Sequence, residues 1–236
     1  HQDVEIIVIG DKKTPSGVAE YCEKLSTQSS VIIKYFDVEH QINYLKKFPE
    51  LNKYLPYNSF SRRNIGDLIA YEEGFPTVIR VDDDNFPTDD DFIKKHNIVG
   101  NDIETEVLKS KNGWYNICEE LIDEDNIPFY PRGFPYSKRW YNIAISKTVK
   151  KIPVVLNAGL WLGDPDVDAV TRLCKPINAI SFKRSYGDTF ALDIGTWCPI
   201  NTQNTSYSRE IIPASFVIHC RYSPPSSSET CSKISL

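Results

Sequence analysis

The stretch TVIRVDDD, residues 77–84, is the most informative segment for predicting the fold of this 236-residue chain. Its first half is rich in β-branched side chains, which favour a buried strand. Its second half is three consecutive aspartates, Asp82, Asp83 and Asp84. Carboxylates packed together at the end of a buried strand repel one another unless a cation lies between them. The triplet therefore indicates either a metal site or, alternatively, a helix cap or an exposed turn.

Upstream of this stretch, the chain shows a strand–helix–strand pattern. The run VEIIVIGD, residues 4–11, is apolar at nearly every position, as in a strand covered on both faces. A helix is expected over residues 14–26 and a second strand over residues 30–38, which together form a βαβ unit. Another helix is expected over residues 61–74. The pattern predicts an α/β fold with a mostly parallel central sheet flanked by helices, whose ligands bind at the carboxyl ends of the strands.

The second half of the chain differs in composition. Residues 127–143 are rich in proline and aromatic residues, which is typical of loops or an edge strand. Residues 153–173 predict a strand, a glycine-containing turn and a helix that starts near Pro165. Residues 190–208 predict a strand followed by a polar loop. The tail, residues 216–236, is rich in serine and proline and is expected to be flexible.

Composition and charge narrow the possible classes of function. The 27 Lys and Arg residues are outnumbered by 32 Asp and Glu residues, and the basic residues are scattered, so no nucleic-acid partner is expected. No apolar run approaches the roughly 20 residues of a membrane-spanning helix. The chain contains no methionine, so we expect a processed protein or an excised piece. Cytoplasmic and Golgi-associated locations both remain open.

A hard divalent cation would relieve the repulsion among the three aspartates. Carboxylate oxygens suit Mg²⁺ or Mn²⁺, and both ions keep water or a substrate phosphate in their remaining coordination positions. At the carboxyl edge of a parallel sheet, the triplet therefore predicts a metal–diphosphate site. A second acidic cluster, residues 89–91, is interpreted as charge at the start of a helix.

Several segments resemble a known group of enzymes. VDDDNFP, residues 81–87, resembles the DXD motif of the GT-A glycosyltransferases, which use nucleotide-sugar donors. Three further segments resemble the STELLO-type glycosyltransferase family. They are PYNSFSRRNIGDLIAYEEG (residues 56–74), NAGLWLGDPDVDAVTRL (residues 157–173) and GTWCPINTQNT (residues 195–205).

A second resemblance is to the reversibly glycosylated polypeptides, which include the UDP-arabinopyranose mutases. It rests on YPRGFPYSKRW, residues 130–140, and on AGLWLGDPDVDA, residues 158–169. The resemblance to these families implies a GT-A, Rossmann-like domain over residues 1–215, with a nucleotide-binding half (1–90) and an acceptor half (91–215). It implies a metal-dependent transferase that uses a UDP-sugar donor and a glycan or other acceptor. A UDP-sugar mutase and a non-catalytic binding module are the alternatives.

On the donor side, the resemblance assigns three residues to the nucleotide-sugar. Asp11 follows the first predicted strand and would face uracil or ribose, or would simply cap the turn. Arg62, Arg63 and Asn64 open the helix before the aspartates, where a helix N-terminus and a guanidinium both favour a phosphate. Arg63 is the preferred phosphate or ribose contact.

The resemblance also assigns a role to each of the three aspartates. Asp82 would contact the ribose and share in metal binding, Asp84 would ligate Mn²⁺ or Mg²⁺, and Asp83 would support both. The families commonly complete the metal shell with a residue near the C-terminus. Here the only histidine in that region is His219, which is not expected to be a ligand.

On the acceptor side, the resemblance implies three catalytic candidates. Asp166 or Asp168 would be the catalytic base or would hydrogen-bond the sugar, although a role as charge at a helix start is equally compatible. Arg132 matches the arginine that carries the sugar in the reversibly glycosylated polypeptides; because guanidinium stays protonated, we assign it first to diphosphate binding. Trp161 would stack on the sugar, and residues 196–205 would line the cleft with amides.

Overall fold

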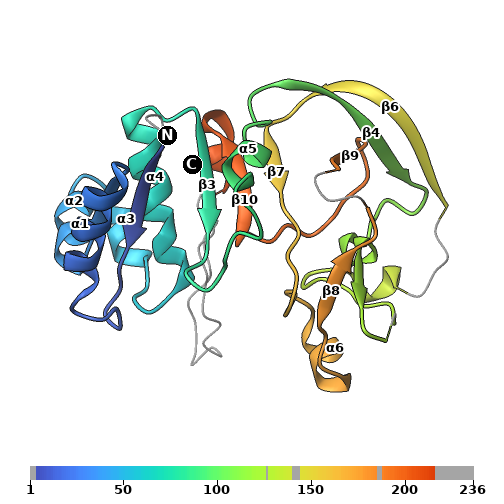
Figure 1. Cartoon of the computed structure of the whole chain (residues 1–236), viewed down its shortest axis with the longest axis horizontal. Coiled ribbons are helices and arrows are strands. Elements are labelled where there is room, and N and C mark those ends of the chain that lie inside the picture. Colours follow the sequence, from blue (N-terminus) through green and yellow to red (C-terminus); the bar gives the residue numbers. More distant parts are fainter. Residues whose placement is uncertain (1–3, 126, 140–143, 185–187, 216–236) are drawn as a thin grey trace, which may run out of the picture. The chain divides into compact units, whose positions relative to one another are not determined.

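The computed structural model describes residues 4–125, 127–139, 144–184 and 188–215 (Figure 1). It divides into two compact units, each described here by itself. The first is formed by residues 4–73 with 213–215, and the second by Gly74–Ile212. The division falls at residue 73 rather than near residue 90, where the two predicted halves meet. The predicted flexible tail, residues 216–236, lies outside the described residues.

The first unit contains the predicted βαβ element. Strands β1 (Glu5–Ile9) and β2 (Ile32–Phe36) pair in parallel, with Glu5 opposite Ile32 and Ile9 opposite Phe36. The connecting helix α1 (Val18–Ser29) is 12 residues long, so the chain can cross over and return in the same direction. The carboxyl ends of both strands therefore lie at the same edge of the sheet, where Gly10 follows β1 and Asp37 follows β2.

Helices close the apolar side of this small sheet. They are α2 (Val38–Leu45), α3 (Pro49–Tyr54), the 3₁₀-helix η1 (Phe60–Arg63) and α4 (Asn64–Glu73). Gly66 lets α4 approach β1 closely, because a Cβ at this position would lie 3.2 Å from a side-chain carbon of Ile9. The buried core here comprises Leu45, Leu55, Ile65 and Ile69.

The strand before the aspartates, β3 (Thr77–Val81), pairs differently from the prediction. Its neighbour is β10 (Asn204–Ser208), which is antiparallel to it and also antiparallel to β7 (Leu156–Ala158). The α/β class is confirmed, but a mostly parallel central sheet is not. The partner strand, with the sequence NTSYS, is polar yet mostly buried, so its sequence lacks the apolar pattern that would have identified it.

The rest of the second unit is also built from small sheets. The long strands β4 (Asp102–Ser110) and β6 (Ile145–Pro153) run antiparallel along their whole length in Figure 1, and β9 (Phe190–Leu192) pairs with β4 in parallel. Strands β5 (Leu121–Asp123) and β8 (Ala179–Phe182) form an antiparallel pair.

The short helices of this unit lie between the strands. They are α5 (Phe92–His96), η2 (Ile117–Glu120), η3 (Tyr136–Lys138), α6 (Ala169–Cys174) and η4 (Arg209–Ser215), which runs past the end of the unit. A buried core forms around Cys118, Leu121, Phe129, Val167, Ile177 and Ala179.

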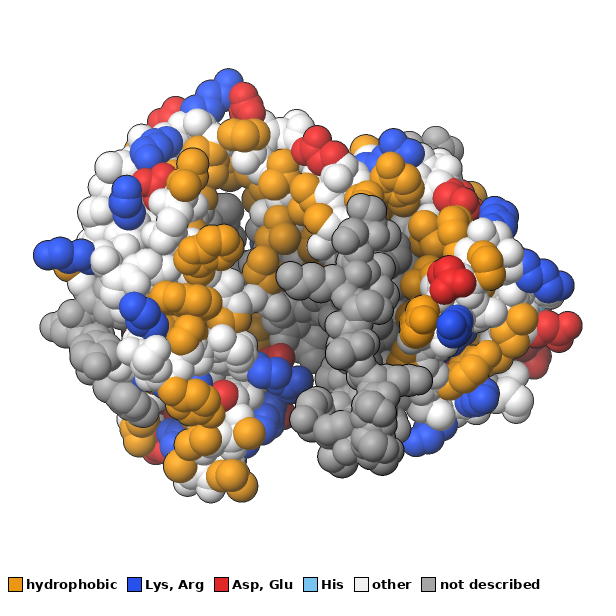
Figure 2. Space-filling view, turned by 180° about the vertical axis from the view of Figure 1, so that it is seen from behind, with side chains coloured by type: hydrophobic (Ala, Val, Ile, Leu, Met, Phe, Trp, Pro, Cys, Tyr) orange, Lys and Arg blue, Asp and Glu red, His pale blue; other side chains and the backbone are white. Residues whose placement is uncertain are grey.

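Surface charge and helix length bear on the partners of the chain. On the face shown in Figure 2, basic and acidic side chains of the described residues are interspersed. Within the described residues, every helix is too short or too polar to cross a bilayer.

Candidate functional site

A large cavity lies within the second unit, with a volume of about 950 Å³. A second, more polar pocket of about 380 Å³, where several separate segments of the chain meet, shares lining residues such as Arg132 and Asp166 with this cavity. The residues that line this pocket are Asp84, Asn85, Arg132, Trp161, Leu162, Asp164, Asp166, Arg172 and Gln203. The pocket therefore brings together four residues singled out from the sequence: the predicted metal ligand Asp84, the predicted catalytic residues Arg132 and Asp166, and Trp161.

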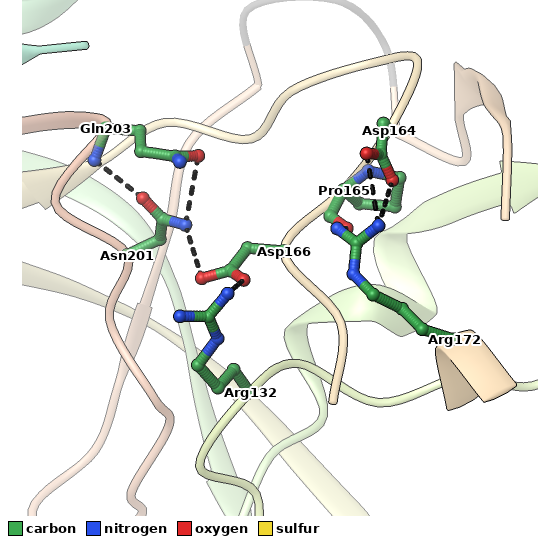
Figure 3. Close-up of polar contacts among 7 residues, drawn as sticks. All are labelled: Arg132, Asp164, Pro165, Asp166, Arg172, Asn201 and Gln203. Carbon is green, nitrogen blue, oxygen red and sulfur yellow. Dashed lines mark hydrogen bonds and ion pairs between the residues drawn. The ribbon is translucent and has the colours of Figure 1, made fainter. Parts of the chain in front are cut away.

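Backbone pairing holds Arg132 beside Asp166. The two segments form an isolated antiparallel bridge between Pro131 and Val167, and the Arg132 amide donates to the Asp166 carbonyl at 3.0 Å. The side chains then meet as an ion pair, with Nη2 of Arg132 2.6 Å from Oδ1 of Asp166 (Figure 3). The Arg132 side chain is 73% exposed and that of Asp166 20% exposed, so both remain accessible from the cavity.

Amide side chains fix the other oxygen of Asp166. Nδ2 of Asn201 donates to Oδ2 of Asp166 at 3.0 Å and to Oε1 of Gln203 at 3.2 Å (Figure 3). The backbone amide of Gln203 donates to Oδ1 of Asn201 at 2.6 Å, which sets the orientation of the Asn201 amide. Asn201 and Gln203 come from residues 196–205 and line the cavity, and their role in binding a ligand stays a prediction.

A second ion pair lines the same pocket. Nη1 of Arg172 lies 2.9 and 3.1 Å from the two carboxylate oxygens of Asp164, and Nη2 donates to the Pro165 carbonyl at 3.1 Å (Figure 3). Arg172 comes from α6, so these contacts fix the loop that carries Asp166 to the helix that follows it.

Asp168 has different surroundings from Asp166. It is the N-cap of α6, where its carboxylate accepts from the amides of Val170 and Thr171 and from the Thr171 hydroxyl. It also pairs with Arg139 at 3.0 Å, and the two side chains are only 7% and 4% exposed. Burial raises the pKa of Asp168, but the hydrogen bonds from Thr171 and Arg139 outweigh burial and hold this pKa below its ordinary value. These contacts favour a structural role, and catalysis by Asp168 stays a prediction.

The aspartate triplet forms a turn directly after β3, in which the Asn85 amide donates to the Asp82 carbonyl at 3.2 Å. Of the three aspartates, Asp84 lines the cavity. Among the described residues, none donates a hydrogen bond to the Asp84 carboxylate, and no group of three acidic, histidine or cysteine side chains forms a metal cluster. A divalent ion at Asp84 therefore stays a prediction.

Trp161 lines both the large cavity and the polar pocket. Its indole Nε1 is buried and has no hydrogen-bond partner among the described residues. A buried donor without a partner costs about 1–3 kcal/mol, so such a group usually meets water or a ligand. Sugar stacking by Trp161 stays a prediction.

The remaining predicted donor residues belong to the first unit. Asp11 follows β1, and its carboxylate accepts from the amides of Lys12 at 2.7 Å and Ser59 at 3.3 Å. Nε of Arg63 donates to the Phe60 carbonyl at 3.1 Å. Asn64 is fully buried at the start of α4.

Sequence reasoning named Arg62 but preferred its neighbour Arg63, and the structure places Arg62 at the carboxyl end of the β1–β2 sheet. Its Nε and Nη2 donate to Oε1 of Gln41 at 2.9 and 2.6 Å, and the Gln41 amide donates to the carbonyls of Gly10 and Phe36. The Arg62 guanidinium lies 4.3 Å from the Tyr57 ring centroid. Burial lowers the pKa of Arg62, although the negative charge of Asp11 acts in the opposite direction. The sequence offered two adjacent arginines and no signal to choose between them.

Comparisons with known proteins identify distant relatives. No protein-family model matches the chain. UDP-arabinopyranose mutase 3 of Arabidopsis thaliana is 29% identical over 135 residues, which cover 57% of this chain and 33% of the relative. The probable glycosyltransferases STELLO2 and STELLO1 of the same plant are each 24% identical over 217 residues, or 86% of this chain and 26% of the relative. The resemblance drawn from the sequence motifs is confirmed, and the chain spans about a quarter to a third of the length of these relatives.

Proposed function

We propose that this chain is a metal-dependent glycosyltransferase that uses a nucleotide-sugar donor, most simply a UDP-sugar, in a GT-A type of fold. The observation that carries the proposal is the polar pocket of the second unit. It gathers Asp84, Arg132, Trp161 and Asp166 from four separate segments. Each of these residues lies in a segment that resembles a glycosyltransferase or UDP-sugar mutase family.

Asp84 and Arg132 form the donor side of the proposed site. Both line the pocket, where an exposed guanidinium and a carboxylate suit a diphosphate and its counter-ion. Mn²⁺ or Mg²⁺, when bound, supplies a Lewis acid that offsets the charge on the departing diphosphate. Arg132 orients the phosphates by its fixed hydrogen-bond geometry, and Asp82 and Asp83 add negative charge next to Asp84 in the same turn.

The first unit, taken by itself, also contains residues that the resemblance assigns to a nucleotide. Asp11 and Arg63 are candidates for ribose and phosphate, as the resemblance implies. Arg62 supports this edge from within, because Gln41 holds its buried guanidinium at the ends of both parallel strands. In sheets of this kind, ligands bind beyond the carboxyl ends of the strands.

Asp166 is the proposed catalytic base. Its carboxylate is held from two sides, by Arg132 and by Asn201, and it faces the cavity. It would accept the proton of an acceptor hydroxyl while that oxygen forms a bond to the sugar. The bond between the sugar and the phosphate breaks in the same process, and the nucleoside diphosphate leaves with the electron pair.

A UDP-sugar mutase is the second candidate. It is favoured by the similarity to UDP-arabinopyranose mutase 3 and by the position of Arg132 in the pocket. A mutase interconverts the pyranose and furanose forms of the donor, needs no acceptor and releases no free nucleotide. The two candidates therefore differ in their products.

The test is to incubate the purified chain and Mn²⁺ with a panel of UDP-sugars, with and without a mixture of oligosaccharides. The products are resolved by liquid chromatography and mass spectrometry. A transferase releases UDP, and this release increases when the acceptor is present and stops in EDTA. Ring isomers without UDP would instead establish the mutase. If neither product forms from any UDP-sugar, the proposed enzyme is contradicted and a binding module remains.

A further inference from the structure

His96, the last residue of α5, is a buried histidine that has no role in the proposed reaction. It is only 3% exposed. Its Nδ1 lies 2.8 Å from Oγ of Ser206, and its Nε2 lies 2.9 Å from Oδ1 of Asn204. Nδ2 of Asn157 lies 3.5 Å from the same Nδ1. Both ring nitrogens therefore contact side chains of the sheet formed by β3, β10 and β7.

These contacts give a reason for the polar sequence of the buried strand β10. Ser206 pairs with Asn157 of β7, and side chains two residues apart along a strand, such as Asn204 and Ser206, point to the same face. The three side chains thus form one polar patch on the face of the sheet that His96 covers. Burying polar groups is costly unless they are hydrogen-bonded, and His96 supplies bonds to them.

The contacts also assign the position of the proton on the His96 ring. Nδ2 of Asn204 donates to the Leu160 carbonyl at 3.1 Å, which turns Oδ1 of the same amide toward His96. This oxygen can only accept a hydrogen bond, so Nε2 of His96 carries the proton. Nδ1 of a neutral ring is then an acceptor, and the Ser206 hydroxyl is placed to donate to it. The surroundings therefore fit a neutral imidazole.

His96 connects three segments that carry residues of the proposed site. Asp84 lies in the loop that leads into α5. Gln203 directly precedes Asn204, and Trp161 directly follows Leu160, whose carbonyl accepts from Asn204. One hydrogen-bonded joint thus holds the three segments, all within the second unit.

The joint is tightly packed at Gly159. The amide of Gly159 donates to the Asn204 carbonyl at 2.7 Å, and a Cβ at Gly159 would overlap the Asn204 side-chain amide. This position therefore requires glycine, and the Asn204 side chain has little freedom to turn away from His96.

The described groups that face His96 carry no compensating charge. β10 and β7 present two amides and a hydroxyl to the ring. On α5 the charged residues are Lys94 and Lys95, and Lys95 forms an ion pair with Asp89. The other two aspartates of the acidic cluster before α5 are exposed. A proton added to Nδ1 would therefore place an unpaired positive charge in a buried site.

The charge on β3 lies on the other face of the sheet. The Arg80 guanidinium lies 5.1 Å from the ring centroid of Tyr207, which is adjacent to Ser206 and so points away from His96. Burial lowers the pKa of His96, although the hydrogen bond to Asn204 acts in the opposite direction.

We propose that His96 is a positioning residue of the proposed site, whose neutral ring holds the segments carrying Asp84, Trp161 and Gln203 together and whose protonation in mild acid loosens them. The inference rests on the proposed function for what these segments do, and it adds how their arrangement is maintained and regulated. The joint itself can be tested without any substrate.

The first experiment measures backbone hydrogen exchange by mass spectrometry at pH 7.5 in the wild type, His96→Ala, His96→Gln and the control His40→Gln. His40 is a suitable control because its side chain is 68% exposed. His96→Ala should increase exchange about tenfold in residues 157–161 and 201–206, because Asn204 and Ser206 lose their partner. His96→Gln should show a smaller increase, because its amide can still donate to Asn204. His40→Gln should leave both segments unchanged.

The second experiment measures urea unfolding from pH 7.5 to pH 5.5. The folded chain resists protonation of His96, whereas the unfolded chain takes up the proton near the ordinary histidine pKa of about 6.5. Relative to His96→Gln, which cannot titrate, the unfolding equilibrium constant of the wild type should rise by up to about tenfold per pH unit below this value. His40→Gln should retain the pH dependence of the wild type.

These outcomes decide the inference even if His96→Ala does not fold, because His96→Gln carries the pH test. The same pH dependence in the wild type and His96→Gln would overturn it. Unchanged exchange in a folded His96→Ala would also overturn it, as would an equal change of pH dependence in His40→Gln.

UDP release separates this inference from the proposed function. Between pH 7.5 and pH 5.5, the activity of the wild type relative to His96→Gln should fall about tenfold, because misplacement of site residues slows the reaction. If the wild type turns over a UDP-sugar and this ratio stays constant, the inference fails and the proposed function stands. If no UDP-sugar is turned over but exchange and unfolding behave as expected, the joint stands and the proposed function fails.

Discussion

The pairs Arg132–Asp166 and Arg139–Asp168 are built from the same two segments of the chain. The first lines a cavity, and its arginine is 73% exposed. The second is buried, with side chains only 4% and 7% exposed, and it caps a helix. The two aspartates are two residues apart and their arginines are seven apart, yet one pair lines a cavity and the other supports a helix. Of these two carboxylates of the motif GDPDVDA, Asp166 is therefore accessible from the cavity, whereas Asp168 is buried and supports the fold.

The largest expected difference between the two pairs is in stability. Asp168→Asn leaves the buried Arg139 without a counter-charge, which should lower the free energy of unfolding by about 3–5 kcal/mol. Asp166→Asn is the matched control, because it makes the same change beside an exposed arginine and should cost less than about 1 kcal/mol. Urea unfolding of both variants measures the difference. Similar losses in the two variants would refute the distinction between the pairs.

The next expected difference is in activity. Asp166→Asn should reduce UDP release by at least about 100-fold, because the proposed base is lost while the side chain keeps its shape. Asp168→Asn, assayed at a temperature where it remains folded, should retain most of its turnover. Liquid chromatography of UDP provides the measurement. The reverse order of the two variants would exchange their assigned roles.

A smaller effect is expected when the exposed arginine is replaced. Arg132→Lys keeps the charge but loses the planar, two-pronged geometry that suits phosphate. Its KM for the donor should rise about tenfold, equivalent to about 1.4 kcal/mol, with a smaller change in kcat. Arg132→Ala should raise KM further. Unchanged donor KM in both variants would remove Arg132 from the donor site.

The smallest effect is the pH dependence of the buried pair. The pKa of Asp168 is lowered in the folded chain, so its contribution to stability is complete above the ordinary aspartate pKa of about 3.9 and is lost as the pH falls through the lowered value. The stability gap between wild type and Asp168→Asn should therefore narrow below about pH 4. Urea unfolding from pH 6 to pH 3.5 would show this narrowing. A gap that widens with acid would contradict the assigned direction.

The local sequence pattern was sufficient to predict part of the fold. The run of residues 4–11 and the helix and strand that follow it correctly predicted the parallel pair β1 and β2, because their signals are apolar and close together in sequence. The pairing of β3 with β10 could not be predicted in this way. More than 120 residues separate the two strands, and β10 is polar.

The same limit applies to the site. The motifs picked out segments of which Asp84, Arg132, Trp161 and Asp166 line one pocket, and what these residues bind stays a prediction. The motifs could not separate Asp166 from Asp168, because the burial of Asp168 beside Arg139 arises only when the segment packs against residues 130–139. Arg63 was preferred to Arg62 for a similar reason, since the partner of Arg62, Gln41, lies in another helix.

The most direct test of the central claim is a thermal melt with UDP and Mn²⁺, compared with EDTA and with the Asp84→Asn variant. A ligand at about 100 times its Kd adds roughly 2.7 kcal/mol of stability. For a chain of this length, that corresponds to a rise in Tm of about 5–10 °C. We predict such a rise for the wild type, its loss in EDTA and its loss in Asp84→Asn. An equal rise in Asp84→Asn would contradict the metal assignment, and no rise with UDP would contradict the nucleotide-sugar site itself.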